Sequence, residues 1–201
     1  MAASELPAGE IEVEPEPTPE ELEAAQRRRD ALAHVRAFGD PILRSRAREV
    51  QSFDDDLRLQ VMRMGALMHD AQGIGLAAPQ VGIANRLLVY RVLTTGSLRV
   101  LVNPLVEWSG DDTEWMEEGC LSLPAVHVDV KRPVDVRVRA QDERGDTVLV
   151  EASGLEARVI QHEIDHLDGV LILDHAKRDQ RKQAMRDMRE ALEERAEQHE
   201  H

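Results

Sequence analysis

The feature that most constrains the fold of this chain is a run of alternating apolar and polar residues between positions 126 and 142. The alternating valines are Val126, Val128, Val130, Val134, Val136 and Val138. A period of two places every valine on one face of an extended strand and the polar side chains on the other face. Sheets with one solvated face are typically antiparallel. The run therefore predicts half-buried antiparallel strands.

Other segments supply the remaining elements of the expected fold. Apolar runs at residues 86–92 and 99–108, and another at 147–152 after the turn DERGD, predict further strands. A helical period with an Asp cap follows Phe53, and a helical period returns from Leu155 onward. The order of a helix, several strands and a helix, with no internal repeat, indicates an α+β fold rather than alternating βαβ units.

Composition excludes several classes of protein. The chain has a single cysteine, Cys120, which rules out an internal disulfide. No signal peptide is visible, and no apolar run approaches the roughly 20 residues of a membrane span, so we expect a soluble cytoplasmic protein without a membrane partner. The formal net charge of −14 argues against general binding to nucleic acids such as DNA, because phosphate contacts need clustered Lys and Arg.

The two ends of the chain differ from its centre. Residues 1–34 form an acidic extension whose first 17 residues, rich in Glu and Pro, are expected to be disordered. A helix is then predicted, with Thr18 as its N-cap and Pro19 at its first position. We expect the packed domain over residues 35–175 and a charged C-terminal helix over residues 176–201.

The segment HEIDH, residues 162–166, has the H-E-x-x-H spacing of a metal site. Residues four apart share a helix face, so His162 and His166 can bind one metal with Glu163 beside them. Apolar residues lie on two faces of this segment, one with Leu155 and the histidines, which predicts a buried helix. Two buried histidines need a partner, and ordinary hydrogen bonds within the core are the alternative to a metal.

A catalytic metal of this kind usually takes three protein ligands and leaves one position for water. Ile172 occupies the position where the extended motif H-E-x-x-H-x-x-G-x-x-H requires a third histidine. Glu190, at a thermolysin-like separation, falls inside the charged terminal helix. Cys120 is the strongest remaining donor, after a glycine at the end of an expected strand. A lone cysteine is otherwise most often a small buried apolar residue.

The segment GIGLAAPQ, residues 73–80, is the third candidate motif. Its glycines match the dinucleotide fingerprint G-x-G-x-x-A, but that fingerprint follows a strand and opens a helix. Here a helix precedes the glycines, and Pro79 and a strand follow, so we reject this interpretation. Glycines also let the backbone approach a ligand closely, and the alternative is an ordinary turn between a helix and a strand.

Together, GIGLAAPQ (73–80), EGCLSLP (118–124) and QHEIDHLDG (161–169) resemble the three motifs of bacterial peptide deformylases in order and spacing. The resemblance covers roughly residues 35–175. It implies antiparallel sheets packed around a central helix that carries HEIDH, followed by a C-terminal helix. It also implies hydrolytic removal of the N-formyl group from the N-terminal methionine of newly made proteins, with release of formate.

The resemblance implies roles for nine positions. The implied metal ligands are Cys120, His162 and His166. The implied catalytic groups are Glu163 as the base and, at the oxyanion, Gln80 and the Leu121 backbone N–H. The implied contacts to the substrate backbone are Ile74, Gly75 and Gly119. The family works with ferrous iron (Fe2+), with Ni2+ or Co2+ as active substitutes, whereas the donor types alone suit Zn2+.

Two features depart from the family pattern, and two other functions remain open. Many members carry an Arg that contacts the substrate seven residues after the cysteine, where this chain has His127. The extension over residues 1–34 lies outside the shared pattern. A metalloprotease that cuts internal peptide bonds is one alternative. A non-enzymatic metal-binding module is the other, with His127 and His175 as the nearby spare ligands.

The predicted terminal helix carries a basic stripe. Residues 177–189 hold six cations and two acids. One side of the helix collects Arg178, Arg181, Lys182, Arg186 and Arg189. Because the implied substrates emerge from ribosomes, whose surface is largely RNA, we hypothesise that this stripe docks the protein on the ribosome. A solvated helix face is the alternative interpretation.

Overall fold

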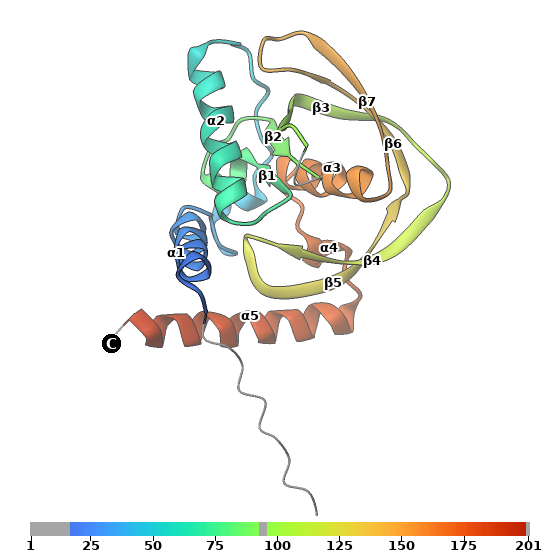
Figure 1. The fold of residues 1–201 in the computed structure, drawn as a ribbon. Helices are drawn as coiled ribbons and strands as arrows, with labels where there is room; N and C mark the ends of the chain where they lie inside the picture. The colour runs from blue at the N-terminus through green and yellow to red at the C-terminus, as the bar shows by residue number, and fades with distance from the viewer. Residues whose placement is uncertain (1–16, 93–95, 200–201) are drawn as a thin grey trace, which may run out of the picture.

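The chain folds into two antiparallel sheets around a central helix (Figure 1). The computed structural model describes residues 17–92 and 96–199, without the side chains of residues 192–199. The disorder predicted for residues 1–17 falls outside this description except at its last residue. The mixed helical and antiparallel architecture confirms the expected α+β class.

The larger sheet has five strands in the order β1-β2-β3-β6-β7, all paired antiparallel. Its strands are β1 (Gly75–Ala77), β2 (Leu87–Tyr90), β3 (Arg99–Ser109), β6 (Asp135–Gln141) and β7 (Thr147–Ser153). The smaller sheet pairs β4 (Thr113–Cys120) with β5 (Leu123–Pro133). The strands therefore form two separate sheets, and the smaller one carries Cys120 at the end of β4.

The valine run crosses from one sheet to the other without a loop. Its first half lies in β5 and its second half in β6, and only Val134 separates the two strands. The even-numbered positions stay buried on both sides of this point. Val128 belongs to the apolar cluster beside the C-terminal helices, whereas Val136 belongs to the cluster around the central helix. The inward face of this continuous segment therefore contributes valines to two apolar clusters, one from β5 and one from β6.

The central helix, α3 (Gly154–Leu167), contacts strands of both sheets. Ile160 and Leu167 are fully buried against the larger sheet, and His166 is buried as well. The prediction of a buried helix is confirmed with one correction. Leu155, at the start of the helix on the histidine face, is 45% exposed. Its side chain lines a cavity instead of joining the core.

Two N-terminal helices pack beside the larger sheet, α2 directly and α1 through α2. Helix α2 (Asp55–Asp70) packs on β1 and β2, and the Asp54 side chain caps it by accepting a hydrogen bond from the Leu57 N–H at 3.0 Å. Helix α1 (Pro19–Ala33) packs on α2. The predicted Thr18 cap is confirmed, since its hydroxyl accepts a bond from the Glu21 N–H.

Short helices and the C-terminal helix complete the fold. The short helices are η1 (Pro41–Arg44), η2 (Ala78–Val81) and α4 (Ile172–His175). Helix α5 (Arg178–His199) lies along β5 and buries Ala184 and Met188 against it. Within the described ranges, no helix is both long enough and apolar enough to cross a membrane.

Candidate metal centre

Two elements bring together three side chains that could bind a metal. Cys120 ends β4, and His162 and His166 lie one turn apart on α3. One donor atom from each residue lies within 4.8 Å of the other two, and this is the only such group of three in the part of the chain that the structure describes. Cys120 Sγ lies 3.2 Å from His166 Nε2. These soft and borderline donors fit a divalent transition metal.

Irregular pairing aims the cysteine at the helix. The register between β4 and β5 shifts between Gly119 and Cys120, so that Cys120 pairs with Leu123 rather than with the next residue in line. A register irregularity of this kind bends a strand and redirects a side chain. The α3 helix supplies the opposite side, because residues four apart present both imidazoles to the same face.

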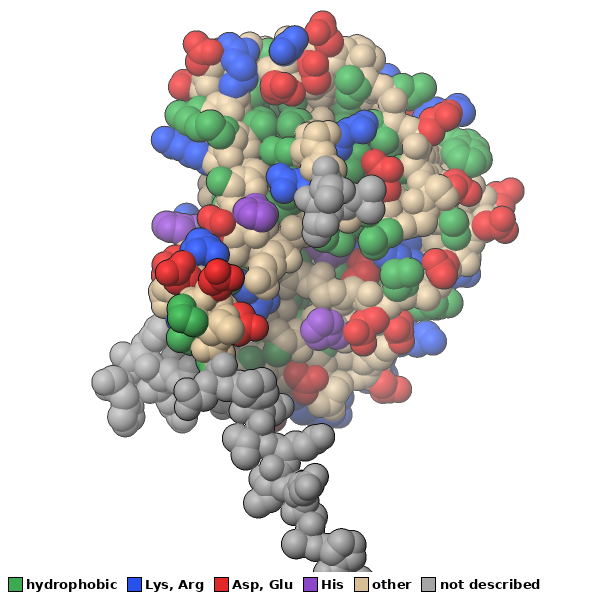
Figure 2. All heavy atoms as spheres, in the orientation of Figure 1, with side chains coloured by type: hydrophobic (Ala, Val, Ile, Leu, Met, Phe, Trp, Pro, Cys, Tyr) green, Lys and Arg blue, Asp and Glu red, His purple; other side chains and the backbone are tan. Residues whose placement is uncertain are grey.

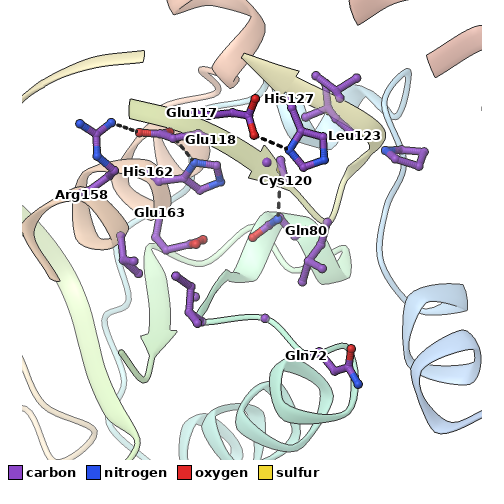
Figure 3. A pocket seen from close by; sticks show the side chains of 18 of the residues that line it. Gln72, Gln80, Glu117, Glu118, Cys120, Leu123, His127, Arg158, His162 and Glu163 are labelled. Atoms are coloured by element: carbon purple, nitrogen blue, oxygen red, sulfur yellow. Dashed lines mark hydrogen bonds and ion pairs between the residues drawn. The ribbon is translucent and has the colours of Figure 1, made fainter. Parts of the chain in front are cut away.

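Glu118 fixes the orientation of His162 (Figure 3). His162 Nδ1 lies 3.1 Å from Glu118 Oε2, and because a carboxylate can only accept, Nδ1 carries the proton and donates it. The other ring nitrogen, Nε2, is therefore the one that a metal could take once it carries no proton. This buried carboxylate also accepts hydrogen bonds from Arg132 at 2.7 and 2.9 Å and from Arg158 at 2.7 Å.

The two arginines join Glu118 to several elements. Arg132 also donates to Asp165 on α3 at 2.9 Å, and Arg158 donates to the backbone carbonyls of Val130 and Glu114. Burial alone would raise the pKa of Glu118, but the hydrogen bonds from Arg132 and His162 outweigh it and lower the pKa well below its usual value. Glu118 therefore stays ionised and can hold the imidazole throughout the ordinary pH range.

Sequence reasoning missed these supporting residues, although a signal was present. Arg132 continues the inward parity of the valine run, where a charged residue is out of place unless it is paired. Arg158 lies four residues before His162 and thus on the same helix face. A cation at each of two inward positions predicts a buried acid nearby, and Glu118 is that acid.

The pKa values of the two histidines are shifted in opposite directions. Burial lowers the pKa of His166 well below its usual value, so this imidazole is neutral and ready to bind a metal. For His162, burial also acts to lower the pKa, but hydrogen bonds to Cys120 and Glu118 outweigh it and raise the pKa. A metal that binds at His162 would therefore displace a proton, which would couple its affinity to pH.

Glu163 is a buried carboxylate beside the three donors. Only 4% of its surface is exposed, and Oε2 has no hydrogen-bond partner among the described residues. Burial raises its pKa to about 7, although the positive charges of His162 and Arg132 act in the opposite direction. A carboxyl group with this pKa can both take up and return a proton near neutral pH.

Glycine at position 75 makes room for this carboxylate. A Cβ built on Gly75 would overlap the Glu163 carboxyl group. Gln80, in η2, is held by its Oε1, which accepts the Ala77 N–H at 2.8 Å. Its Nε2 points toward Cys120 Sγ at 3.8 Å and toward Ser122 Oγ at 3.4 Å. The amide nitrogen of Gln80 thus faces the cluster as a donor.

A cavity of about 410 Å³ opens onto the cluster. Every predicted site residue except the deeply buried His166 lines it. The residues in question are Ile74, Gly75, Gln80, Gly119, Cys120, Leu121, His162 and Glu163. Figure 2 shows this face hollowed between the α1–α2 side and the β4–β5 side.

The two spare histidines, His127 and His175, lie apart from the three donor atoms. His127 stands at the rim of the cavity over Gly119, and its Nδ1 lies 3.7 Å from Glu117 Oε1. His175 is 2.8 Å from Asp165 and belongs to the network behind Arg132. Neither joins the group of three donors.

The chain is similar to known proteins over most of its length. The polypeptide deformylase family model matches residues 32–182. A peptide deformylase of Acidothermus cellulolyticus is 45% identical over 161 residues, which cover 80% of this chain and 88% of that protein. One from Thermotoga neapolitana is 48% identical over 146 residues, covering 73% and 88%.

Solved structures give the same result. The peptide deformylase from Synechococcus elongatus, in complex with actinonin, has a TM-score of 0.74 at 43% identity and covers 77% of this chain and 84% of its own. That from Legionella pneumophila has a TM-score of 0.77 at 36% identity, covering 81% and 96%.

The cluster of Cys120, His162 and His166 could hold a metal, and the similarity to peptide deformylases makes this chain a metal-dependent hydrolase. The chain belongs to the polypeptide deformylase family. Its reaction is removal of the formyl group from the N-terminal methionine of newly made proteins. The resemblance seen in the three motifs is thereby confirmed.

The packing of Glu163 on Gly75 generates a test. Gly75→Ala is expected to lower kcat for formate release by roughly 10- to 100-fold. The added methyl group would push the Glu163 carboxylate out of its position, and proton transfer depends on that position. Gly110→Ala is the matched control, since a Cβ there makes only ordinary contacts with Trp108 and Asp135. Turnover by Gly75→Ala equal to that of the control would show that the position of Glu163 does not depend on this glycine.

Proposed function

We propose that Cys120, His162 and His166 hold one catalytic metal and that Glu163 moves the proton during deformylation. The observation that carries this proposal is the buried Glu163 carboxyl group, with a pKa near neutrality and an unpartnered oxygen, beside three converging donor atoms. A divalent ion held there supplies Lewis-acid chemistry, since it lowers the pKa of water and polarises a carbonyl.

The residues around the metal have separate roles in proton transfer and in stabilising the oxyanion. Glu163 takes a proton from the water that attacks the formyl carbon and later returns it to the leaving amine. Gln80 Nε2 and the Leu121 backbone N–H donate to the carbonyl oxygen as it gains negative charge. The direction of the Gln80 amide, whose oxygen is already engaged by Ala77, supports this role.

We propose that the peptide backbone pairs with Ile74, Gly75 and Gly119, which line the two sides of the cavity. Apolar side chains lie next to the metal-binding residues in the same cavity. Leu155 and Met116 are half-exposed there although each is large and apolar, and Val159 lies beside them. A methionine side chain that enters this space would cover them.

The two alternative functions lack such support. A purely structural metal site takes four protein ligands, and the described residues offer three. Cleavage of internal peptide bonds is distinguished by its product, since it yields peptide fragments from a formyl-free, blocked peptide instead of formate.

We propose ferrous iron as the metal, as the resemblance implies, with Ni2+ or Co2+ as active substitutes. The donor set suits Zn2+ equally well by chemistry alone, so the ion must be measured. Protein purified under anaerobic conditions is expected to contain about one iron per chain, with activity that follows iron content rather than zinc content. Activity proportional to bound zinc would reject iron.

Substitutions at Glu163 and Cys120 separate proton transfer from metal binding. Glu163→Ala is expected to keep near wild-type metal content while formate release falls at least about 100-fold, because it removes the base and no ligand. Cys120→Ala is expected to lose both, because two imidazoles hold such ions weakly. Metal analysis paired with a formate assay checks both variants. Retained activity in Glu163→Ala, or full metal content in Cys120→Ala, would contradict these roles.

We further propose that the basic stripe of α5 docks the protein on the ribosome in the cytoplasm, where its substrates emerge. One side of α5 packs on β5 through Ala184 and Met188. The cations of the stripe are all exposed: Arg178, Arg181, Lys182, Arg186 and Arg189. On a chain with a formal charge of −14, such a stripe would offer RNA a local attraction.

Reversal of the stripe tests this proposal. The quadruple variant Arg181→Glu, Lys182→Glu, Arg186→Glu and Arg189→Glu is expected to sediment less with ribosomes, most clearly at low salt. Turnover of a short formyl-Met peptide, which needs no ribosome, is expected to stay at the wild-type rate. Unchanged ribosome binding would leave the stripe as a solvated helix face.

A further inference from the structure

We propose that helix α1, which precedes the family-matched region except for its last two residues, forms a wall of the peptide groove, where Arg28 recognises an acidic residue downstream of the methionine. This inference rests on the proposed function, since it concerns the substrate of the same site. The cavity that contains the metal-binding residues is also lined by Arg28 and Leu32.

Helix α1 is held against the start of the groove. Arg28 Nε lies 3.4 Å from the backbone carbonyl of Ala71, the residue that caps the C-terminus of α2. Ala31, one turn further along, is buried at 5% exposure. Leu32 is half-buried and faces the cavity. The helix thus meets the chain where α2 gives way to the glycine-rich segment.

The chain between Gln72 and Gly75 leads from Arg28 to the metal-binding residues. It begins at Gln72, beside the bond between Arg28 and Ala71, and reaches Gly75, which packs against Glu163. The segment turns at Gln72, whose φ is 59°, so its ends lie closer together than the roughly 10 Å that three extended residues would span. A peptide that pairs its methionine with Ile74 and runs away from Glu163 therefore reaches Arg28 two or three residues later.

Of the two arginines that line the cavity, only Arg28 is exposed, and the exposed acid of the lining, Glu117, lies 3.7 Å from His127. Arg158, the other arginine in the lining, is buried and bound to Glu118. Arg28 is exposed and forms no ion pair within the described part of the chain, and only its Nε is engaged there. Its two terminal nitrogens are the right donors for the two oxygens of a carboxylate.

The neighbouring arginines are engaged within the helix. Arg27 lies 3.7 Å from Glu23, and Arg29 donates to Gln26 at 2.6 Å. Neither lines the cavity. Arg29 is therefore a control for Arg28 that carries the same charge, on the same helix, one residue away.

The test compares formylated tetrapeptide amides that carry Glu or Gln at the third or fourth residue, with formate release as the readout. The wild-type enzyme at low salt is expected to favour Glu over Gln about three- to fivefold in kcat/KM, through KM, at one of these positions. Arg28→Gln is expected to abolish this ratio, and Arg28→Glu to reverse it. Arg29→Glu is expected to keep the wild-type ratio.

The outcomes are distinct. If Arg28→Glu and Arg29→Glu change the ratio equally, the effect is one of long-range charge, and the contact with Arg28 is rejected. A wild-type ratio of one at both positions also rejects it, while formate release continues to support the reaction. If no peptide yields formate, the proposed function fails, and this inference fails with it.

Discussion

The buried carboxylate of Glu118 holds together the elements that form the proposed metal centre. It accepts hydrogen bonds from Arg132 on β5, from Arg158 on α3 and from His162, so one side chain fixes the smaller sheet, the central helix and the His162 imidazole relative to each other. Removal of one partner from a buried ionic cluster costs roughly 3–5 kcal/mol, a large share of the stability of a domain. The same interaction that positions the site therefore also stabilises the fold, and neither can be altered alone.

Much of this arrangement is local enough to be predicted from the sequence. The alternation of valines depends only on the period of a strand, and the pairing of His162 with His166 depends only on the pitch of a helix. No local rule brings residue 120 to residue 166, so the sequence points to Cys120 only through elimination among donors and through the resemblance.

The features that could not be predicted arise from contacts between distant segments. The valine pattern does not reveal that the strand changes sheets at Val134, because the alternation is the same on both sides. Leu155 is apolar and at helical spacing, yet it is exposed because its neighbour is a cavity rather than another layer of core. The position of Arg28 beside that cavity likewise follows from how α1 packs on α2.

The passage of one ribbon through both sheets restricts how the length of this chain can change. Between Pro133 and Asp135 there is no loop to absorb an inserted or deleted residue. A single insertion there would turn Val136, Val138 and Ala140 to the solvent and their polar neighbours toward α3, because side chains alternate with a period of two. Only changes by two residues preserve the inward face. Among relatives, length variation is therefore expected in the turn at residues 142–146 and at the termini, and not at this crossing.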